Sequence, residues 1–260
     1  MDSPPPLIIC DQSDPHVLHV TLSRPAQRNA LSNALIIELA DTLTAAAGND
    51  DIRCVVLSGQ DTFFSAGADI KEMAQSGFAA INNASRNAAW HSIECFPKPL
   101  IAAVEGIAFG GGHELVMLAD IVIASEGARF AQPEINIGIL PGDGATQRLV
   151  RVAGKSLTML MVLTGAPIDA ATALQAGLIA EVTPNGAAQS RALEIANVIA
   201  LKAPVAARLA KRAVLAAYET TLSAGLAAER QAIREAFDTH DQGEGMAAFI
   251  EKRPARFTGR

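Results

Sequence analysis

Short apolar segments typical of β-strands recur along the chain, and segments with helical spacing lie between them. Strand-like runs occupy residues 17–22 (VLHVTL), 52–58 (IRCVVLS), 100–104 (LIAAV) and 120–125 (DIVIAS). Between the first two runs, residues 31–47 repeat apolar side chains with the period of a helix. Because strands that alternate with helices pair into one largely parallel sheet, this pattern predicts an α/β fold of repeated strand–helix turns.

The pattern changes toward the C-terminus. Residues 187–237 are almost entirely compatible with helix, and Pro204 is the main interruption. We therefore expect a core domain over residues 1–195 and a helical region over residues 196–260.

Charge and cysteine content narrow the class of protein. The chain has 260 residues and a formal net charge of −6. Because a nucleic-acid-binding surface must be basic, this balance argues against such a partner, although a basic cluster within residues 252–260 still allows a small phosphorylated ligand. Cys10, Cys54 and Cys95 are far apart and form no CxxC pair, which favours a reducing compartment over disulfides or a zinc site. With no signal-peptide pattern and no long apolar run, we expect a cytoplasmic protein without a membrane partner.

Several catalytic motifs are missing from the sequence. It contains no GxSxG nucleophile elbow, no GxGxxG after a strand and no HExxH metal motif, so we expect no metal site. The segment ending at Gly154-Lys155-Ser156 resembles the end of a phosphate loop, but Leu149 stands where that loop requires glycine.

Two segments of small residues remain as candidates for a reactive site. They are residues 64–69 (FSAGAD) and residues 106–114 (GIAFGGGHE). Small side chains let a ligand approach the backbone, and unpaired N–H groups at a helix start can stabilise an oxyanion. Taken alone, the glycine run is better explained as a tight strand-to-helix connection. Glu114 and Glu134, taken alone, could be ordinary surface carboxylates, and their spacing does not prove that they meet.

A resemblance decides between these alternatives. The run PLIAAVEGIAFGGGHELVMLADIVIASEGARFAQPEINIGILPGDGATQRLVRVAGKS resembles the core signature of the crotonase, or enoyl-CoA hydratase/isomerase, family. The segments SRPAQRNALS, FFSAGADIKEM, VLTGAPIDAATALQAGLIAEV and EGMAAFIEKRPARF are similar to further family patterns in the same order. The resemblance implies a crotonase-type spiral of repeated ββα turns, with a C-terminal helical trimerisation region and assembly into a homotrimer or dimer of trimers.

The resemblance also implies roles for individual residues. Glu114 and Glu134 match the two catalytic glutamates, and the N–H groups of Ala68 and Gly111 match the oxyanion hole. The positions that it implies for substrate and coenzyme A binding are Ala66, Asp69, Ile70, Lys71, Gly142 and Lys252. It matches Lys252 to a lysine that is often supplied across a subunit interface. The substrate is an acyl-CoA thioester, and no cofactor is needed beyond the coenzyme A that the substrate carries.

Retention of both glutamates favours a hydratase, a hydro-lyase that adds water across the 2,3 double bond of a 2-enoyl-CoA. An isomerase, another crotonase-fold acyl-CoA enzyme and a non-catalytic CoA-thioester-binding protein are the alternatives. RPAQRNALSNAL and the FTGR ending are similar to bacterial 2,3-dehydroadipyl-CoA hydratases of phenylacetate degradation, although a general short-chain hydratase fits almost as well. Asp143 departs from the common PGAGGTQRL pattern; we expect it to face outward, and an inward orientation would alter substrate choice or reaction. For His113 we expect a packing or surface role.

Overall fold

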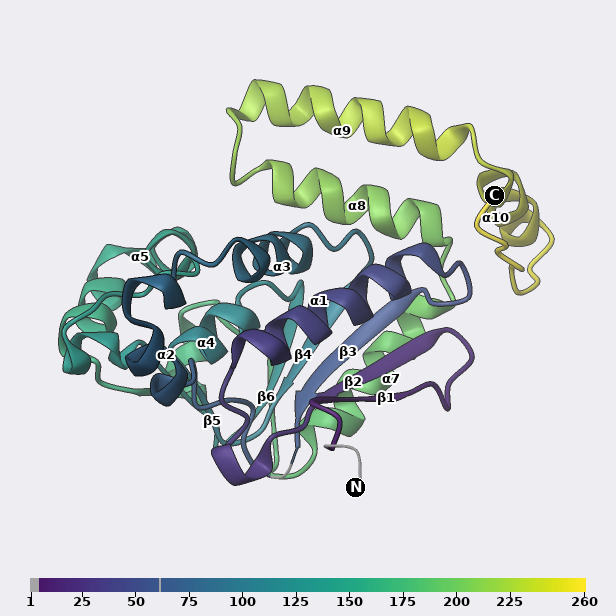
Figure 1. Ribbon diagram of the computed structural model, residues 1–260. Coiled ribbons are helices and arrows are strands. Elements are labelled where there is room, and N and C mark those ends of the chain that lie inside the picture. Colours follow the sequence, from purple (N-terminus) through teal and green to yellow (C-terminus); the bar gives the residue numbers. More distant parts are fainter. Residues whose placement is uncertain (1–4, 61) are drawn as a thin grey trace.

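A six-stranded sheet runs through the centre of the molecule. The structure is a computed structural model and describes residues 5–60 and 62–260 (Figure 1). The strand order is β1-β2-β3-β4-β6-β9, in which β1 pairs antiparallel and every other neighbouring pair is parallel. The strands are β1 (Ile8–Asp11), β2 (Val17–Leu22), β3 (Cys54–Gly59), β4 (Leu100–Val104), β6 (Ile121–Ser125) and β9 (Glu181–Thr183). The strands predicted at 17–22 and 100–104 are therefore confirmed, and those predicted at 52–58 and 120–125 are shifted by one or two residues.

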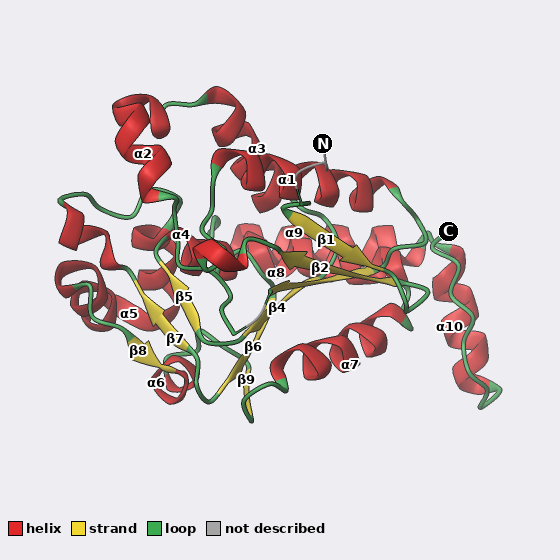
Figure 2. Cartoon of the chain, turned by 60° about the horizontal axis from the view of Figure 1, so that its bottom comes forward, coloured by secondary structure: helices red, strands yellow, loops and turns green. Residues whose placement is uncertain are grey.

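Helices cover both faces of this sheet (Figure 2). On one face lie α1 (Asn33–Gly48) and α3 (Ala84–Glu94), and α1 buries its apolar side chains in the main core. On the other face lies α7 (Ala188–Ala200), whose buried alanines recur every fourth residue. This stripe of small side chains packs against Val56, Ile101 and Ile123 of the sheet.

A second, three-stranded sheet supports the glycine-rich segment. Its strands are β5 (Ile107–Phe109), β7 (Arg129–Ala131) and β8 (Ile168–Asp169), in the order β5-β7-β8. Around it lie α4 (Gly111–Val116), α5 (Ala145–Thr164), α6 (Ala170–Gln175) and the 3-10 helix η3 (Pro133–Ile137). Another 3-10 helix, η1 (Pro25–Gln27), precedes α1. Between β3 and β4 the chain folds as α2 (Ile70–Ser76), the 3-10 helix η2 (Gly77–Ala80) and α3.

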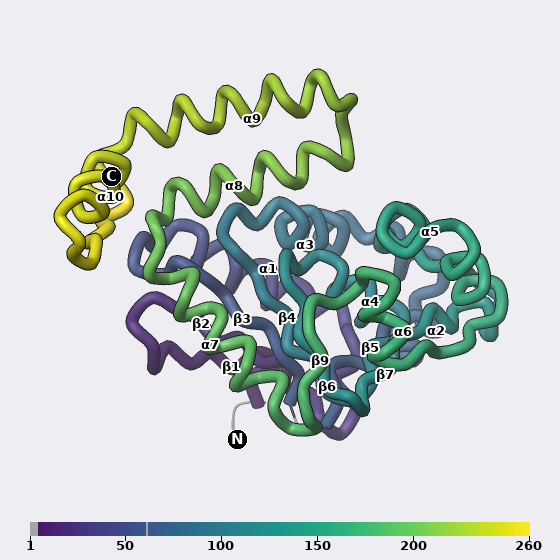
Figure 3. Tube along the Cα trace, turned by 180° about the vertical axis from the view of Figure 1, so that it is seen from behind, coloured from purple at the N-terminus to yellow at the C-terminus, as the bar shows by residue number. Residues whose placement is uncertain are grey.

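The last three helices extend away from the core. They are α8 (Pro204–Ala216), α9 (Leu222–Phe237) and α10 (His240–Ile250), and α8 and α9 lie side by side in Figures 1 and 3. Arg53 ties this region to the sheet by donating to the carbonyl oxygens of Ala200 and Phe257 at 3.0 and 2.9 Å. The expected boundary between residues 195 and 196 falls inside α7, which packs on the sheet, whereas the projecting helices start at Pro204.

None of the helices in the described part of the chain is both long enough and apolar enough to span a membrane.

Candidate active site

The first feature of the site is a pair of N–H groups on adjoining backbone segments. Isolated bridges join Leu31 to Ala68 and Ser65 to Ala108, so the loop after β3 lies against the start of β5. A Cβ atom built on Gly111 would lie 3.6 Å from the Ala68 nitrogen. Gly111 opens α4, where a residue has no intrahelical acceptor for its N–H. Within the described chain, neither the Ala68 nor the Gly111 N–H has a hydrogen-bond acceptor, and both remain available to a ligand oxygen.

This backbone path requires glycine at two positions. Gly67 has φ of +97°, and a Cβ there would lie 2.7 Å from the Phe109 carbonyl oxygen. Gly110 has φ of +51°, and a Cβ there would lie 2.9 Å from Oε1 of Glu134. Because L-side chains are disfavoured at such φ values and would collide here, glycine allows the two N–H groups and Glu134 to converge.

Glu114 is the buried carboxylate of the site. Its side chain is on α4, and the residue is only 2% exposed. Its Oε1 accepts hydrogen bonds from the N–H groups of Asp143 at 2.8 Å and Ala145 at 2.9 Å. Burial raises the pKa of Glu114 to about 7, and the negative charges of Asp143 and Glu134 add to this rise, whereas the two N–H groups oppose it. The carboxyl group can therefore take up and release a proton near neutral pH.

Glu134 is the second carboxylate, at the start of η3, and it is half-buried. Burial raises its pKa, and the nearby Asp143 charge raises it further. The Gln132 amide satisfies both of its neighbours in one orientation, in which its nitrogen donates to Glu134 Oε1 at 3.0 Å and its oxygen accepts from His113 Nδ1 at 3.1 Å. His113 is buried, which lowers its pKa to about 3, so the imidazole is neutral at physiological pH. We expected a packing or surface role for His113, and the structure buries its ring against Phe130.

The orientation of Asp143, in the turn before α5, differs from our prediction. We expected Asp143 to face outward, but its side chain is only 15% exposed and pairs with the guanidinium of Arg86 on α3. One of the two hydrogen bonds, from Nη1 to Oδ1, measures 3.0 Å. The outward orientation is therefore wrong, because α3 places a cation directly against the turn. The Asp143 N–H meanwhile holds Glu114.

The remaining predicted substrate residues near this site lie along the loop into α2 and in the turn. Ala66 is half-buried, whereas Ile70, Lys71 and Gly142 are exposed. The Asp69 carboxylate accepts from Glu72 N–H as the helix cap and pairs with Arg24 at 2.9 Å, which lowers its pKa despite partial burial. Its side chain is thus occupied in holding the loop, and it leaves contact with a ligand to the neighbouring backbone.

Lys252 is the one predicted site residue that a single chain does not bring to the others. It follows α10, which lies at the opposite end of the molecule from α2 and α5 in Figures 1 and 3. An open hollow of about 520 Å³ lies between α10 and the segment that follows it, lined by His240, Glu244, Arg253, Pro254 and Arg256.

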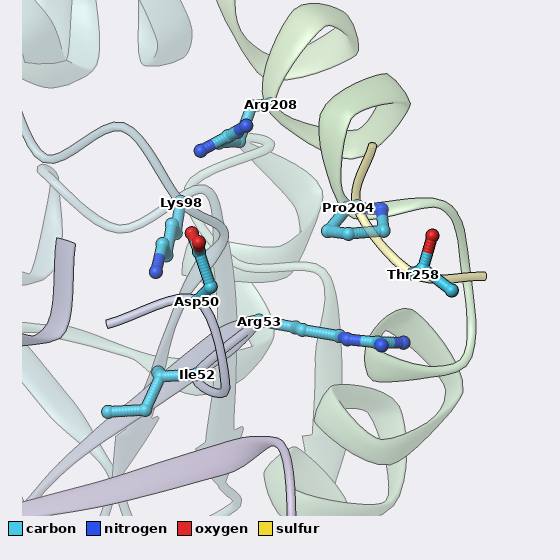
Figure 4. A pocket seen from close by; sticks show the side chains of 8 residues that line it. Asp50, Ile52, Arg53, Lys98, Pro204, Arg208 and Thr258 are labelled. Carbon is cyan, nitrogen blue, oxygen red and sulfur yellow. The ribbon is translucent and has the colours of Figure 1, made fainter. Parts of the chain in front are cut away.

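A separate small cavity lies where the C-terminal helices join the core (Figure 4). It has a volume of about 30 Å³, and its lining includes Lys98, Arg208 and Thr258. Lys98 Nζ donates to the carbonyl oxygens of Ala46 and Asn49 at 2.8 and 2.7 Å. The cavity is large enough for a water molecule and far too small for an acyl-CoA.

No cluster of three or more potential metal ligands occurs within residues 5–60 and 62–260. The described site instead consists of two N–H groups and two carboxyl groups with raised pKa values. This set suits stabilisation of an oxyanion together with proton transfer.

Comparison with known proteins places this arrangement in a family. The profile described as Enoyl-CoA hydratase/isomerase matches residues 12–260. The chain belongs to the enoyl-CoA hydratase/isomerase family. Its relatives in the family include a 2,3-dehydroadipyl-CoA hydratase of Escherichia coli (strain K12), 48% identical over 94% of this chain and 96% of that protein. A mitochondrial enoyl-CoA hydratase of Pongo abelii is 45% identical over 92% of this chain and 82% of that protein.

The fold agrees with solved family structures. The crystal structure of an enoyl-CoA hydratase from Bacillus anthracis matches with a TM-score of 0.93 and 38% identity, covering 98% of this chain and 100% of that one. The predicted family and the predicted crotonase-type α/β fold with a C-terminal helical region are both confirmed.

Sequence reasoning missed two side chains that border the site, Gln132 and Arg86, and did not foresee that His113 bonds to Gln132. Gln132 could have been noticed, because it adjoins Pro133-Glu134. Arg86 carries no local signal, since it is one cation in a helix that lies 57 residues before its partner Asp143.

Proposed function

We propose that the chain adds water across the 2,3 double bond of a 2-enoyl-CoA thioester and yields a 3-hydroxyacyl-CoA. The predicted enzyme class, an enoyl-CoA hydro-lyase, is borne out by relatives named enoyl-CoA hydratases at 44% to 48% identity. The observation that carries the residue-level proposal is the convergence of two free N–H groups with two carboxyl groups of raised pKa.

The N–H groups of Ala68 and Gly111 receive the thioester carbonyl oxygen. As a nucleophile adds at C3, negative charge moves onto this oxygen and an enolate forms. Two fixed donors stabilise that charge without reorganisation, and one such donor typically contributes on the order of 10²–10³ in rate.

Glu114 takes the proton of the attacking water. Its Oε1 is held by two N–H groups, which leaves Oε2 to accept a hydrogen bond from water. A base with a pKa of about 7 combines a substantial ionised fraction with real proton affinity. The water oxygen forms its bond to C3 while its proton passes to Glu114.

Glu134 supplies the proton that C2 receives as the enolate collapses. Its pKa is raised by burial and by the Asp143 charge, and Gln132 orients it beside Gly110. Glu114 gains one proton from water, and Glu134 gives one proton to C2. Transfer of a proton from Glu114 to Glu134 then restores both carboxyl groups. Because their charges interact, the pair titrates jointly.

Isomerisation of a double bond is the second candidate activity. It moves one proton between two carbons and needs one carboxyl group, as at Glu134. A buried Glu114 with its own pair of N–H donors favours the hydratase over the isomerase and over a non-catalytic binding protein.

The substrate range is proposed at two levels. The loop from Ala66 to Lys71 and the turn at Gly142 adjoin the N–H groups and Glu114, and we assign them to the acyl-CoA. One relative is named for 2,3-dehydroadipyl-CoA. We therefore propose dicarboxylic enoyl-CoA thioesters, as well as short-chain ones, as candidate substrates in phenylacetate catabolism or fatty acid β-oxidation. No further cofactor is required, since two carboxyl groups and two N–H groups account for every proton and charge.

Self-association forms part of the proposal. The helices α8 to α10 expose large apolar side chains, of which Leu222 is 80% and Phe249 is 86% exposed. We assign this region to a homotrimer or dimer of trimers in which Lys252 reaches the coenzyme A of a neighbouring subunit. A single-chain mass at sedimentation equilibrium would contradict it.

The three free cysteines agree with the proposed cytoplasmic location.

The test is a substrate panel followed by enoyl-thioester absorbance. Crotonyl-CoA, longer 2-enoyl-CoAs and 2,3-dehydroadipyl-CoA are each mixed with the protein, and the products are identified by mass. We expect loss of absorbance with gain of one water. Loss of absorbance without added water, or no change with any thioester, would overturn the hydratase proposal.

A further inference from the structure

A clamp of charged side chains holds the turn at residues 141–144 against α3 and α5. From α3, Arg86 donates through both terminal nitrogens to the Asp143 carboxylate. From α5, Arg148 Nη1 donates to the Asp143 carbonyl oxygen at 3.1 Å and its Nη2 donates to Glu94 of α3. Asp143 is therefore bound at its side chain and at its backbone.

Arg86 is itself fixed in place. Its N–H donates to Asn83 Oδ1 at 3.0 Å as part of the cap of α3. Its guanidinium lies 5.6 Å from the ring centre of Trp90, one helical turn on, and Trp90 is buried. The side chains of Arg86 and Asp143 are only 16% and 15% exposed, so water screens their charges weakly.

Asp143 is connected to the reaction through Glu114. Its N–H donates to Glu114 Oε1 at 2.8 Å, so whatever holds the Asp143 side chain also holds this N–H against Glu114. A carboxylate so close to two others disfavours their ionised forms, and Asp143 raises the pKa of both Glu114 and Glu134. The Arg86 cation offsets that charge and fixes the angle at which the Asp143 N–H meets Glu114.

We propose that Arg86 is a positioning residue of the hydration site, which acts on Glu114 through Asp143 by neutralising its carboxylate and holding its N–H. This inference rests on the proposed function, in which Glu114 is the base. Arg86 has no assigned contact with the reacting atoms, so its action is indirect.

Charged groups reach the surroundings of Glu114 from four elements besides α4. They are Asp143 of the turn, Glu134 of η3, Arg86 and Glu94 of α3, and Arg148 of α5. On α4 itself His113 is neutral because burial lowers its pKa. Removing Arg86 takes away a cation and leaves three acidic groups, so the ionised form of Glu114 becomes less favourable.

The experiment is a double-mutant cycle with Arg86→Met and Asp143→Asn, read as kcat/KM for the hydration of crotonyl-CoA from pH 5 to 9. The acidic limb is the part of this profile in which kcat/KM falls as the pH is lowered. In Arg86→Met this limb should move to higher pH by about one unit. Such a displacement lowers kcat/KM about tenfold at pH values on the acidic side of the limb. In Asp143→Asn the limb should move downward, and in the double variant Arg86→Met should add almost nothing.

Two further variants separate mechanism from misfolding. Arg86→Lys keeps the charge and should restore most of the limb position, although it loses the two-pronged contact. Arg151→Met removes an exposed cation of α5 that donates to the Gln147 carbonyl oxygen, and it should leave the profile unchanged. An equal effect of Arg86→Met with and without Asp143, or no effect at all, would overturn the proposal.

A second measurement does not depend on turnover. The Glu114 carboxyl carbon, labelled with ¹³C and assigned by comparison with Glu114→Gln, is titrated by NMR in the wild type and in Arg86→Met. The pKa of Glu114 should rise in the variant. If it rises while no enoyl-CoA is hydrated, the proposed function fails and the Arg86 coupling stands. An unchanged titration would refute the coupling even in an active hydratase.

Discussion

The inner wall of the site and the segments outside it present different chemical groups. The inner wall, formed by Ala68, Gly111 and Glu114, consists of backbone N–H groups and one buried carboxyl group held by two further N–H groups. The outer segments, residues 70–81 and 135–140, expose large apolar side chains such as Phe78 at 75% and Leu140 at 70%.

This difference separates two tasks. Backbone N–H groups that are held in place by strand pairing or by a helix start cannot rotate. They therefore suit a step in which negative charge must be stabilised at one position. Exposed apolar side chains on short helices can adapt to an acyl chain. We therefore expect substitutions in the inner wall to change kcat and substitutions in the outer segments to change KM.

The largest effect is expected from the carboxyl groups. Glu114→Gln and Glu134→Gln should each lower kcat by about 10²–10⁴, because each removes one proton-transfer group, while the KM changes little. Steady-state hydration of the best panel substrate measures this. Glu126→Gln, at an exposed position away from the site, serves as the control. Full activity in either site variant would remove that residue from the mechanism.

The next effect is on stability and follows from the same buried carboxyl group. The folded-state pKa of Glu114, about 7, lies above its unfolded value of 4.5. Stability from the protonated form is thus fully present below pH 4.5 and is lost as pH rises through 7. Glu114→Gln, which cannot ionise, should exceed the wild type in free energy of unfolding by up to about 3 kcal/mol at pH 8 and by almost nothing at pH 4.5.

Urea denaturation at the two pH values measures this difference. An equal gain at both pH values would point to packing instead of ionisation.

The smallest effect is expected in the outer segments. Phe78→Ala removes an exposed ring on η2, so the KM for longer 2-enoyl-CoAs should rise about threefold to tenfold, as one lost apolar contact typically allows. The kcat and the melting temperature should stay near the wild type. Ile9→Ala, at an exposed position on β1, is the control. A large fall in kcat would erase the distinction between the two regions.

Much of this site could be predicted from local sequence. Glycine at Gly67 and Gly110 reflects a backbone requirement, because positive φ and close contacts exclude other residues. The segment that joins Gly110 to Glu114 is therefore recognisable as a string in the sequence. The strands at 17–22 and 100–104 were predicted for the same reason, since hydrophobic periodicity is a local property.

Other features could not be predicted because they depend on how elements pack. The orientation of Asp143 was predicted wrongly, since a turn residue usually faces solvent and the sequence does not tell that α3 brings Arg86 against it. The bridge from His113 through Gln132 to Glu134 likewise joins α4 to η3, and only their packing makes it.

By itself, the sequence determined the family, four strands of the central sheet (β2, β3, β4 and β6) and the chemical groups of the candidate site, because these follow from local patterns of glycine, apolar residues and carboxylates. Only the tertiary structure decided that Glu114 is buried between two N–H donors and that Arg86 offsets the charge beside it. The physical reason is that burial and electrostatic coupling depend on distances between groups far apart in the chain, and those distances exist only once the helices have packed.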